Sequence, residues 1–254
     1  MSAASGSAAA GANAVWHDVE CGAYAADLAL WNELARGAGG PVLELGAGTG
    51  RVALRLAAAD LDVMAVDSEP ELLEALAERA AERGVCVRTV IADVRELALG
   101  RRFAAILAPM QLVHLMGGDR GRAAMLEASA RHLEPGGFLA AALLADEAVD
   151  ELAPAAGAAE LLPDVLELDG WVHSSLPVEV AFETDRIEVR RLRQLVSPAG
   201  ELSERIDVTR LDRVDAESFE GEAGAVGFIT RERVRIAATA DHVASVVCVL
   251  EAPR

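Results

Sequence analysis

Three glycines at alternate positions, Gly46, Gly48 and Gly50, stand in the stretch PVLELGAGTGR at residues 41–51. Glycine lets a backbone approach a ligand closely, and the first amides of a following helix have no partner inside that helix. The strand, turn and helix pattern around these glycines therefore predicts a ligand cradle. Its spacing departs from the dinucleotide fingerprint GxGxxG/A, because Arg51 occupies the position of the third small residue.

Acidic residues accompany this loop at three predicted strand ends. Glu44 stands just before the glycines, Asp67 ends the apolar run VMAVD, and Asp93 follows the run VIA. Because the carboxyl ends of parallel strands meet at one edge of a sheet, we expect these acids to converge on the loop. Asp67 can accept hydrogen bonds from both hydroxyls of a ribose, and Asp93 can accept one from the exocyclic amine of adenine. The pattern indicates an adenosine-containing ligand.

Strands and helices alternate through the first 145 residues and position these groups. Apolar runs predict strands at 42–45, 62–67, 87–93, 103–109 and 138–144, and helical periodicity predicts helices at 51–59, 70–84 and 119–133. Ser68 and Glu71 fit a capping box for the second of these helices, and Gly84 fits its end. Apolar strands separated by helices predict an α/β fold with a doubly wound, mainly parallel, Rossmann-like sheet.

A different pattern fills residues 171–214. Runs at 178–182, 186–196 and 201–211 alternate in polarity, and Pro198 and Gly200 fit a type I hairpin turn. This predicts an inserted antiparallel β meander, with a bulge at Arg190 and Arg191 where the alternation slips. A helix at 215–228 and strands at 234–238 and 242–252 then return the chain to the first sheet, which reaches about seven strands.

The segment before the glycine loop predicts one helix within residues 15–36, preceded by an irregular segment and ended by Gly37, with Trp16 and Trp31 in the core. The expected organisation is a disordered tail, an N-terminal helical lid, a ligand-binding core, a β insertion that serves as substrate lid or dimer contact, and a closing unit, at residues 1–14, 15–40, 41–145, 146–214 and 215–254.

Composition narrows the classes of partner. The 254 residues are 52% hydrophobic and carry 41 acidic against 23 basic side chains, a net charge of -18. That charge opposes nucleic acid and anionic membranes, and no apolar stretch is long enough for a membrane span. The three cysteines are scattered and the N-terminal residues lack a secretory pattern, so we expect reduced thiols, a cytoplasmic location and no metal site.

Loop, acids and turn together resemble one family, the class I S-adenosylmethionine-dependent methyltransferases. The similar residues are ELGAGTGR at 44–51, Asp67, Asp93 and the turn HLEPGGFLA at 132–140, and the resemblance covers residues 17–145 and the chain from 215 onward. It implies S-adenosyl-L-methionine as cofactor and methyl transfer to an oxygen or nitrogen of a small soluble molecule. The cofactor-binding residues that it implies are Glu44, Gly46, Ala47, Gly48, Asp67, Ser68, Asp93, Val94 and Pro109. For Glu44 the alternative is a structural role, capping the amides of the loop.

The resemblance places the methyl acceptor beyond the fourth strand, at APMQLVHLMGG. Met110, Gln111 and His17 are the implied substrate residues. His114 is a candidate general base or else a helix-packing group, and Tyr24 either orients the transferring methyl or anchors the lid. Arginines of the insertion either bind an anionic acceptor, pair with the interleaved acids, or support a homodimer, and they are Arg186, Arg190, Arg191, Arg193, Arg205 and Arg210.

Two rival functions stay open from the sequence. A nicotinamide-dependent oxidoreductase would use a similar loop, but Arg51 disfavours it. A noncatalytic ligand-binding or assembly protein can share the same fold. Methylation of nucleic-acid bases is the least favoured activity, because the fourth strand ends in APMQ rather than Asn/Asp-Pro-Pro-aromatic and the net charge is negative.

Overall fold

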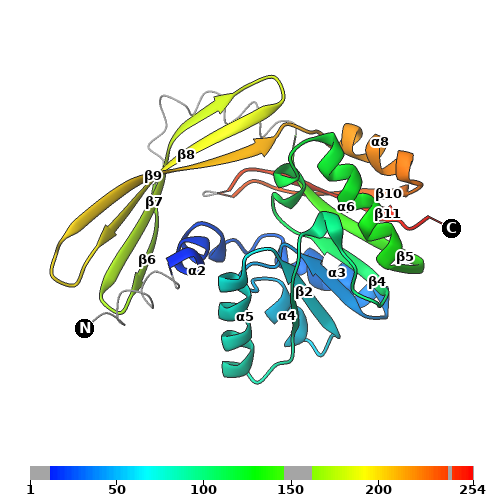
Figure 1. The fold of residues 1–254 in the computed structure, drawn as a ribbon, viewed down its shortest axis with the longest axis horizontal. Helices are drawn as coiled ribbons and strands as arrows, with labels where there is room; N and C mark the ends of the chain where they lie inside the picture. Colours follow the sequence, from blue (N-terminus) through cyan, green and yellow to red (C-terminus); the bar gives the residue numbers. More distant parts are fainter. Residues whose placement is uncertain (1–11, 146–161, 240–241, 254) are drawn as a thin grey trace.

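The computed structural model describes residues 12–145, 162–239 and 242–253, which form two sheets with helices around the first (Figure 1). The larger sheet has seven strands in the order β10-β11-β5-β4-β1-β2-β3, and the smaller has four in the order β6-β7-β8-β9. This confirms the expected α/β fold with an inserted antiparallel sheet. Residues 1–11 of the expected tail lie outside the described residues, as does the start of the insertion, 146–161.

The larger sheet places the candidate residues at one edge. Its strands are β1 (Val42–Leu45), β2 (Val63–Asp67), β3 (Arg88–Ile91), β4 (Phe103–Ala108), β5 (Leu133–Leu144), β10 (Ile229–Ile236) and β11 (Ser245–Glu251). The first five pair in parallel, and β11 and β10 add antiparallel strands beside β5. The strand order reverses between β1 and β4, so a crevice is expected outside the carboxyl ends of these two strands.

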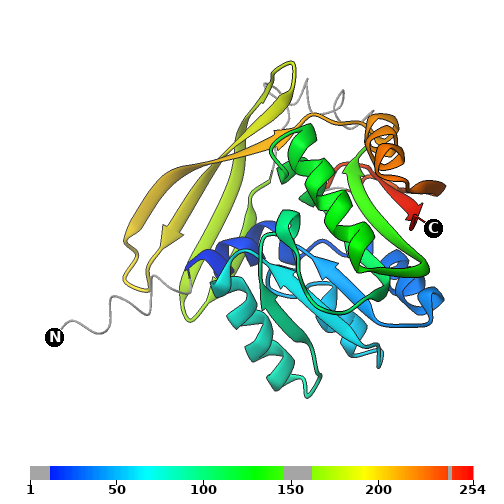
Figure 2. The ribbon, with the colours of Figure 1, turned by 45° about the vertical axis from the view of Figure 1, so that its right-hand side comes forward.

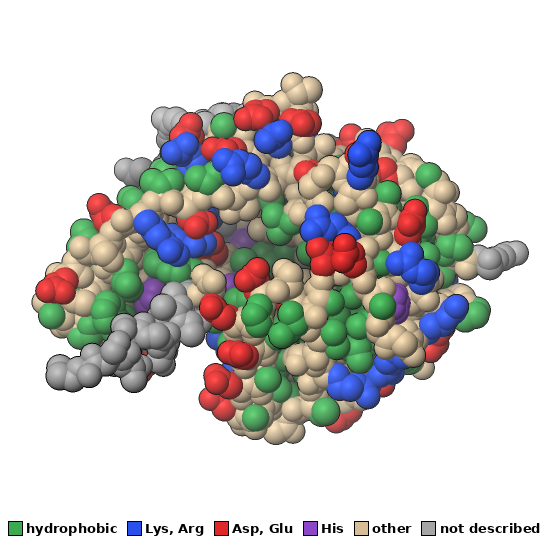
Figure 3. Space-filling model, in the orientation of Figure 1, with side chains coloured by type: hydrophobic (Ala, Val, Ile, Leu, Met, Phe, Trp, Pro, Cys, Tyr) green, Lys and Arg blue, Asp and Glu red, His purple; other side chains and the backbone are tan. Residues whose placement is uncertain are grey.

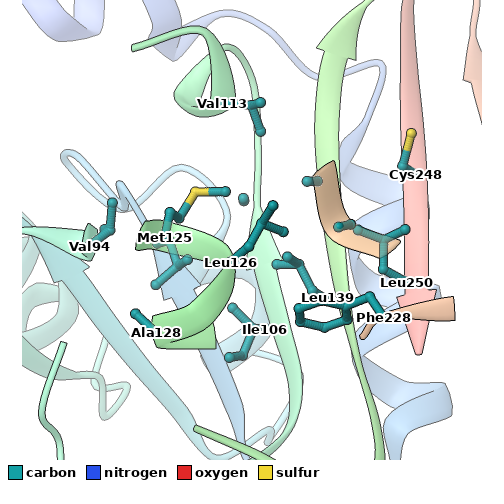
Figure 4. Packing of buried hydrophobic residues seen from close by; sticks show 14 of the residues in the cluster. Val94, Ile106, Val113, Met125, Leu126, Ala128, Leu139, Phe228, Cys248 and Leu250 are labelled. Atoms are coloured by element: carbon teal, nitrogen blue, oxygen red, sulfur yellow. The ribbon is translucent and has the colours of Figure 1, made fainter. Parts of the chain in front are cut away.

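Helices bury both faces of this sheet (Figure 2). One face packs on α3 (Leu28–Ala38), α4 (Ala53–Ala57) and α5 (Pro70–Glu82), and the other on α6 (Asp119–His132) and α8 (Ala216–Val226). On the second face, Leu126 of α6 packs against Ile106 and Leu139 of the sheet (Figure 4). Each such buried side chain contributes about 1.5–3 kcal/mol, so the strand ends are held rigidly.

Helix boundaries differ from two expectations. The capping box is wrong: α5 is capped by Glu69 without a side-chain hydrogen bond, because Pro70 at the first helical position fixes the start and keeps Glu69 extended. Gly84 at the helix end is confirmed, with φ of 65°. The stop at Gly37 is wrong, since α3 continues to Ala38 and the left-handed residue is Gly39, with φ of 66°.

The N-terminal segment is not one helix. It consists of α2 (Ala12–His17), a π-helical turn η1 (Asp18–Gly22) and, after a break, α3, so residues 12–14 belong to a helix rather than to the expected tail. The burial of Trp31 and Trp16 is confirmed. In both views α2 and η1 lie between the inserted sheet and the core (Figures 1 and 2).

The inserted sheet is longer than expected. Its strands are β6 (Asp164–Leu168), β7 (Trp171–Phe182), β8 (Arg186–Val196) and β9 (Leu202–Asp212), and β6 has no counterpart among the predicted strands. The turn is confirmed by the bond from Gly200 N to Ser197 O, 2.8 Å. The bulge lies in β7 rather than β8: Pro177 pairs with Arg191 and Glu179 with Arg190, which leaves Val178 unpaired. Proline lacks the N–H that the ladder needs, so it favours a bulge.

None of the helices in the described ranges is long and apolar enough to cross a membrane.

Candidate functional site

A cavity of about 360 Å³ lies at the carboxyl ends of β1 to β4, where the crevice was expected. It opens beside the hollow between the inserted sheet and the core that is visible in the space-filling view (Figure 3). The predicted cofactor residues that line it are Glu44, Gly46, Ala47, Asp67, Ser68, Asp93, Val94 and Pro109, and the predicted substrate residues are Met110, Gln111 and His17. Of the predicted cofactor residues, Gly48 does not line the cavity.

The glycine loop needs glycine at each of its three positions. Gly46, Gly48 and Gly50 have φ of 63°, 53° and 92°, a region that other residues rarely adopt. A Cβ on Gly46 would meet Leu112 at 2.9 Å, and one on Gly48 would collide with the imidazole of His17. Gly48 is therefore covered by His17, which explains why it is hidden from the cavity.

Asp67 holds the loop and still faces the cavity. Its Oδ2 accepts from Gly48 N at 2.8 Å, and its Oδ1 accepts from Glu69 N at 3.0 Å. Each carboxylate oxygen has two acceptor positions, so both oxygens retain one for a ligand hydroxyl. This geometry fits the ribose-binding role that the sequence predicts.

Glu44 is a buried carboxyl group with an orphaned oxygen. It is 2% exposed, its Oε2 has no hydrogen-bond partner among the described residues, and burial raises its pKa to about 8. A buried, unpartnered carboxylate is costly unless a cation or donor joins it. The residue therefore fits a ligand that brings a cationic group into the cavity, such as the ammonium of S-adenosylmethionine.

Asp93 is held by a neighbour that the sequence analysis missed. The guanidinium of Arg95 binds both carboxylate oxygens, through Nε at 2.9 and 3.1 Å and Nη2 at 2.5 Å, and this lowers the pKa of Asp93. Arg95 also donates to Met116 O at 3.3 Å. The carboxylate is thus fixed at the rim of the cavity, where the sequence predicts a contact to adenine.

Arg51 ties the loop to the N-terminal segment. It donates to both oxygens of Asp27, at 2.5 and 2.7 Å, and to Tyr24 O at 2.9 Å. Asp27 is 2% exposed and also accepts from Trp31 Nε1 at 2.7 Å. The arginine that distinguishes this loop from the dinucleotide fingerprint is therefore the partner of a buried acid.

The turn from α2 into η1 lies over the glycine loop. Asp18 accepts from Thr49 Oγ1 at 2.7 Å and is bound by the guanidinium of Arg79 from α5. The hydroxyl proton of Thr49 goes to Asp18, so the 3.3 Å contact to His17 Nδ1 requires an N–H on that nitrogen. His17 Nε2 lies over Gly48, close to where an added Cβ would stand, and burial lowers the pKa of His17.

The other side of the same segment docks on the inserted sheet. The ring of Trp16 lies under the guanidinium carbons of Arg193 and Arg205, at 5.3 and 5.6 Å. Glu20 accepts from Arg193 at 2.7 and 2.8 Å and from Ser175 Oγ at 2.7 Å. Residues 16–20 therefore connect the glycine loop to the inserted sheet.

A second cavity, of about 260 Å³, adjoins the first. It is enclosed by η1, the ends of β5 and β11, and the inner face of β8 and β9, with Ile187, Val189 and Leu211 among its apolar walls. Cys21, Met110 and Gln111 line both cavities. Met110 has φ of 56°, an uncommon conformation for methionine, at this junction.

The two predicted catalytic residues lie outside the first cavity. Tyr24 lines the second cavity, where burial raises the pKa of its hydroxyl. His114 is 2% exposed, with Nδ1 2.8 Å from Asp212 O and Nε2 accepting from Leu144 N at 3.0 Å. Both ring nitrogens are occupied by backbone groups, which argues against His114 as a general base. It joins η3 (Leu112–Leu115) to β9 and β5, which agrees with the packing alternative.

Most arginines of the insertion pair with acids, which was one of the three alternatives that the sequence left open for them. Ion pairs join Arg186 to Glu183, Arg190 to Glu179, Arg193 to Glu20 and Arg210 to Glu188. Only Arg191, among the six arginines named from the sequence, lines the second cavity, where it pairs with Asp164 and donates to Ser175 Oγ at 2.8 Å.

Comparisons with known proteins agree with this geometry. Residues 42–137 match the methyltransferase domain family. The fold aligns with an S-adenosylmethionine-dependent methyltransferase from Clostridium acetobutylicum over 95% of this chain and 98% of that chain, with a TM-score of 0.73 and 15% identity. Residues 42–137 are therefore a methyltransferase domain, and the chain has the fold of S-adenosylmethionine-dependent methyltransferases.

Two further proteins are similar to this chain. The sugar N-methyltransferase KedS8 from Streptoalloteichus aligns with a TM-score of 0.72 and 20% identity over 92% of this chain and 90% of that chain. The cypemycin N-terminal methyltransferase from Streptomyces is 34% identical over 99 residues, which are 39% of this chain and span 40% of that relative's length. The family and fold inferred from the glycine loop, the two acids and the turn are confirmed, and S-adenosylmethionine is supported as the cofactor.

Proposed function

We propose that the protein transfers a methyl group from S-adenosylmethionine to the nitrogen of a small-molecule amine. The observation that carries this proposal is the junction of two cavities at Cys21, Met110 and Gln111. One cavity has the acids and backbone for the donor, and the other has room for part of a small acceptor. Methyl transfer needs donor and acceptor atoms in line, and this arrangement supports such an approach.

The chain's own residues bind and orient the donor in this proposal. Asp67 receives the ribose hydroxyls, Asp93 the adenine amine, and Glu44 the ammonium, while the backbone of Gly46 to Gly48 lies along the amino-acid tail. When bound, S-adenosylmethionine supplies a methyl group that is already activated by a sulfonium. Positioning and exclusion of water are therefore the main tasks left to the protein.

Acceptor groups in the second cavity suit an amine substrate. Its lining contains two acids, Glu20 and Asp164, which are ion-paired with Arg193 and Arg191 respectively. Their carboxylate oxygens retain acceptor positions for the N–H groups of an ammonium, which is the form that an aliphatic amine takes in water near neutral pH. The name of the cypemycin N-terminal methyltransferase also supports nitrogen as the accepting atom.

A blocked acceptor cavity tests the proposal. Val189 lines the second cavity and not the first, so Val189→Trp should abolish transfer of a labelled methyl to amines while leaving S-adenosylmethionine affinity within about twofold. Val178→Trp, at an exposed bulge position, is the matched control and should retain both. Full transfer by Val189→Trp would place the acceptor elsewhere.

The rival functions are separated by calorimetry and turnover. Titration with NADH and with S-adenosylmethionine distinguishes an oxidoreductase, which would bind only the nicotinamide. A noncatalytic protein would bind S-adenosylmethionine and transfer no label to any amine or alcohol of a metabolite extract.

A homodimer is proposed from the outer face of the inserted sheet. Two rows of apolar side chains cross β7, β8 and β9 there, Val172–Val196–Leu202 and Leu176–Leu192–Ile206. Arg190 lies beyond the second row and Glu204 lies between the two rows, on the other side of Leu192, so a two-fold axis near Leu192 would bring opposite charges together. Ile206→Glu should shift the protein to a monomer in light scattering, whereas Ile229→Glu, equally exposed on the other sheet, should not.

A cytoplasmic location is proposed from the thiols. Cys21, Cys86 and Cys248 are all unpaired. This agrees with a reducing compartment, and fractionation of the cells that make the protein tests it.

A further inference from the structure

His242 enters the acceptor cavity from the chain between β10 and β11. Its ring lies 4.6 Å from the ring of Tyr24, centroid to centroid, with 31° between the planes. Its backbone is held by a bond from His242 N to Thr239 Oγ1 at 3.0 Å and one from Thr239 N to His242 O at 2.8 Å. Within the described part of the chain, no hydrogen bond occupies either of its ring nitrogens. An anchored imidazole with free nitrogens therefore lines the acceptor cavity.

The other titratable groups of this cavity are poorly suited to accept a proton. Burial alone would raise the pKa of Glu20, but hydrogen bonds from Arg193 and Ser175 bring it below its ordinary value. Burial raises the pKa of the Cys21 thiol to about 11, and it also raises that of Tyr24, so both groups keep their protons near neutral pH.

Asp164 and Arg191 are occupied by each other. Burial raises the pKa of Asp164, while the bound guanidinium of Arg191 holds its carboxylate charge in place. The Arg191 guanidinium itself stays protonated under all ordinary conditions. His242 is thus the group in this cavity whose side-chain type exchanges protons near neutral pH.

We propose that His242 is the proton acceptor for the amine substrate, an inference that rests on the proposed amine methyltransferase function. An ammonium drawn toward Asp164 and Glu20 gives its proton to an imidazole nitrogen of His242, which frees the nitrogen lone pair. That lone pair forms the new C–N bond while the methyl–sulfur bond breaks and its electron pair stays on sulfur. The products are the methylated amine, S-adenosylhomocysteine and a proton that His242 returns to solvent.

Tyr24 is a positioning residue in this arrangement. Its ring packs on the imidazole, and the guanidinium carbon of Arg51 lies 5.1 Å from the centre of the same ring. The stack connects the proton acceptor to the glycine loop through Arg51, so the imidazole is fixed relative to the donor. The charged groups that face His242 across the cavity are Asp164 of β6, Arg191 of β8 and Glu20 of η1.

The test compares full-length wild type, His242→Gln and the control His173→Gln. His173 packs on Trp16 at the inner face of the inserted sheet and lines neither cavity. Transfer of labelled methyl to D-glucosamine and to L-alanyl-L-alanine is measured as kcat/KM from pH 6 to 10. His242→Gln should lose about 100-fold at pH 7, in line with general-base contributions, and the loss should shrink as the amine deprotonates in solution. His173→Gln should stay within about twofold of wild type.

Two outcomes would overturn the role of His242. One is full activity of His242→Gln at pH 7, and the other is an equal loss at every pH, which a purely structural role predicts. A second measurement does not depend on turnover: the ¹⁵N imidazole resonance of His242, in protein saturated with S-adenosylhomocysteine, should shift when glucosamine is added. A resonance that does not shift also refutes the proposal.

The proposed function fails in a different way. Wild type that binds S-adenosylmethionine and methylates alcohols but no amine would refute nitrogen as the acceptor, and it would overturn the proton-acceptor role with it. Wild type that methylates amines while His242→Gln does so equally well would refute only the role of His242.

Discussion

Glu44→Gln should make the affinity for S-adenosylmethionine independent of pH. The carboxyl group is buried and burial raises its pKa to about 8, so at pH 7 about nine-tenths of the empty sites hold a proton on it. An ammonium placed beside Glu44 favours the ionised form. Binding of S-adenosylmethionine should therefore release a proton from the protein.

The size of this effect follows from the distance between the pH and the pKa. Ionising a group of pKa about 8 at pH 7 costs about 1.4 kcal/mol, so donor affinity should improve roughly threefold from pH 6.5 to 7 and roughly ninefold from pH 6 to 7. In Glu44→Gln this slope should vanish. The loss of the charged contact should weaken binding by about 1.5–3 kcal/mol.

The stability of the protein without donor should fall as pH rises, whereas donor affinity should increase. Because the folded-state pKa of Glu44 is raised above the ordinary 4.5, its contribution to stability is complete below pH 4.5 and is lost as pH rises to about 8. The full difference corresponds to at most about 5 kcal/mol. Glu44→Gln should therefore be more stable than wild type at pH 9 and show no such advantage at pH 4.5.

Calorimetry in buffers of different ionisation enthalpy gives the number of protons released. We expect about 0.9 at pH 7 for wild type and for Glu33→Gln, whose side chain is exposed on α3, and about zero for Glu44→Gln. Measurements stay below pH 7.5, where the ligand's own ammonium keeps its proton. No proton release by wild type, with affinity flat across this range, would show that Glu44 does not meet the ammonium.

Three further changes test the remainder of the site. Arg51→Met should destabilise the protein by about 3–5 kcal/mol in denaturant unfolding, because it leaves the buried carboxylate of Asp27 without its cation. Adding Asp27→Leu in the same chain should recover much of that loss. If stability did not recover, the two side chains would not be energetically coupled. Gly48→Ala should weaken donor binding, measured by calorimetry, at least tenfold, because alanine is strained at the positive φ of this position and its Cβ would collide with His17. If His17→Ala in the same chain restored full affinity, backbone strain would have no part in the loss. His114→Phe should lower the free energy of unfolding by about 1–3 kcal/mol, since it leaves two backbone groups unpaired. The pH profile of methyl transfer should stay unchanged. An altered profile would support His114 as a general base.

Local signals were enough to predict the positions of the glycine loop and of Asp67. Gly46 and Gly50 need positive φ, and Asp67 ends a fully buried strand, so loop and acid could be placed from spacing alone. The edge at which they meet follows from the parallel sheet. These features depend on neighbours a few residues away or on a fold rule, and both are readable in the sequence.

Contacts between segments that are distant in the sequence could not be predicted from local patterns. Nothing in the periodicity of residues 15–36 indicates that Asp27 binds Arg51 or that Glu20 binds Arg193, because those partners lie in separate elements. His114 and His242 look equivalent as isolated histidines. Only the packing shows that backbone groups occupy the first while the second faces a cavity.

The short connection from Trp16 to Glu20 has a kinetic consequence. Its residues touch the glycine loop on one side and the inserted sheet on the other, through His17 and Asp18 in one direction and Trp16 and Glu20 in the other. In the proposed function, we therefore expect a displacement of this segment that lets the donor leave to move the wall of the acceptor cavity as well. Exchange of the spent cofactor and release of the product should then be coupled.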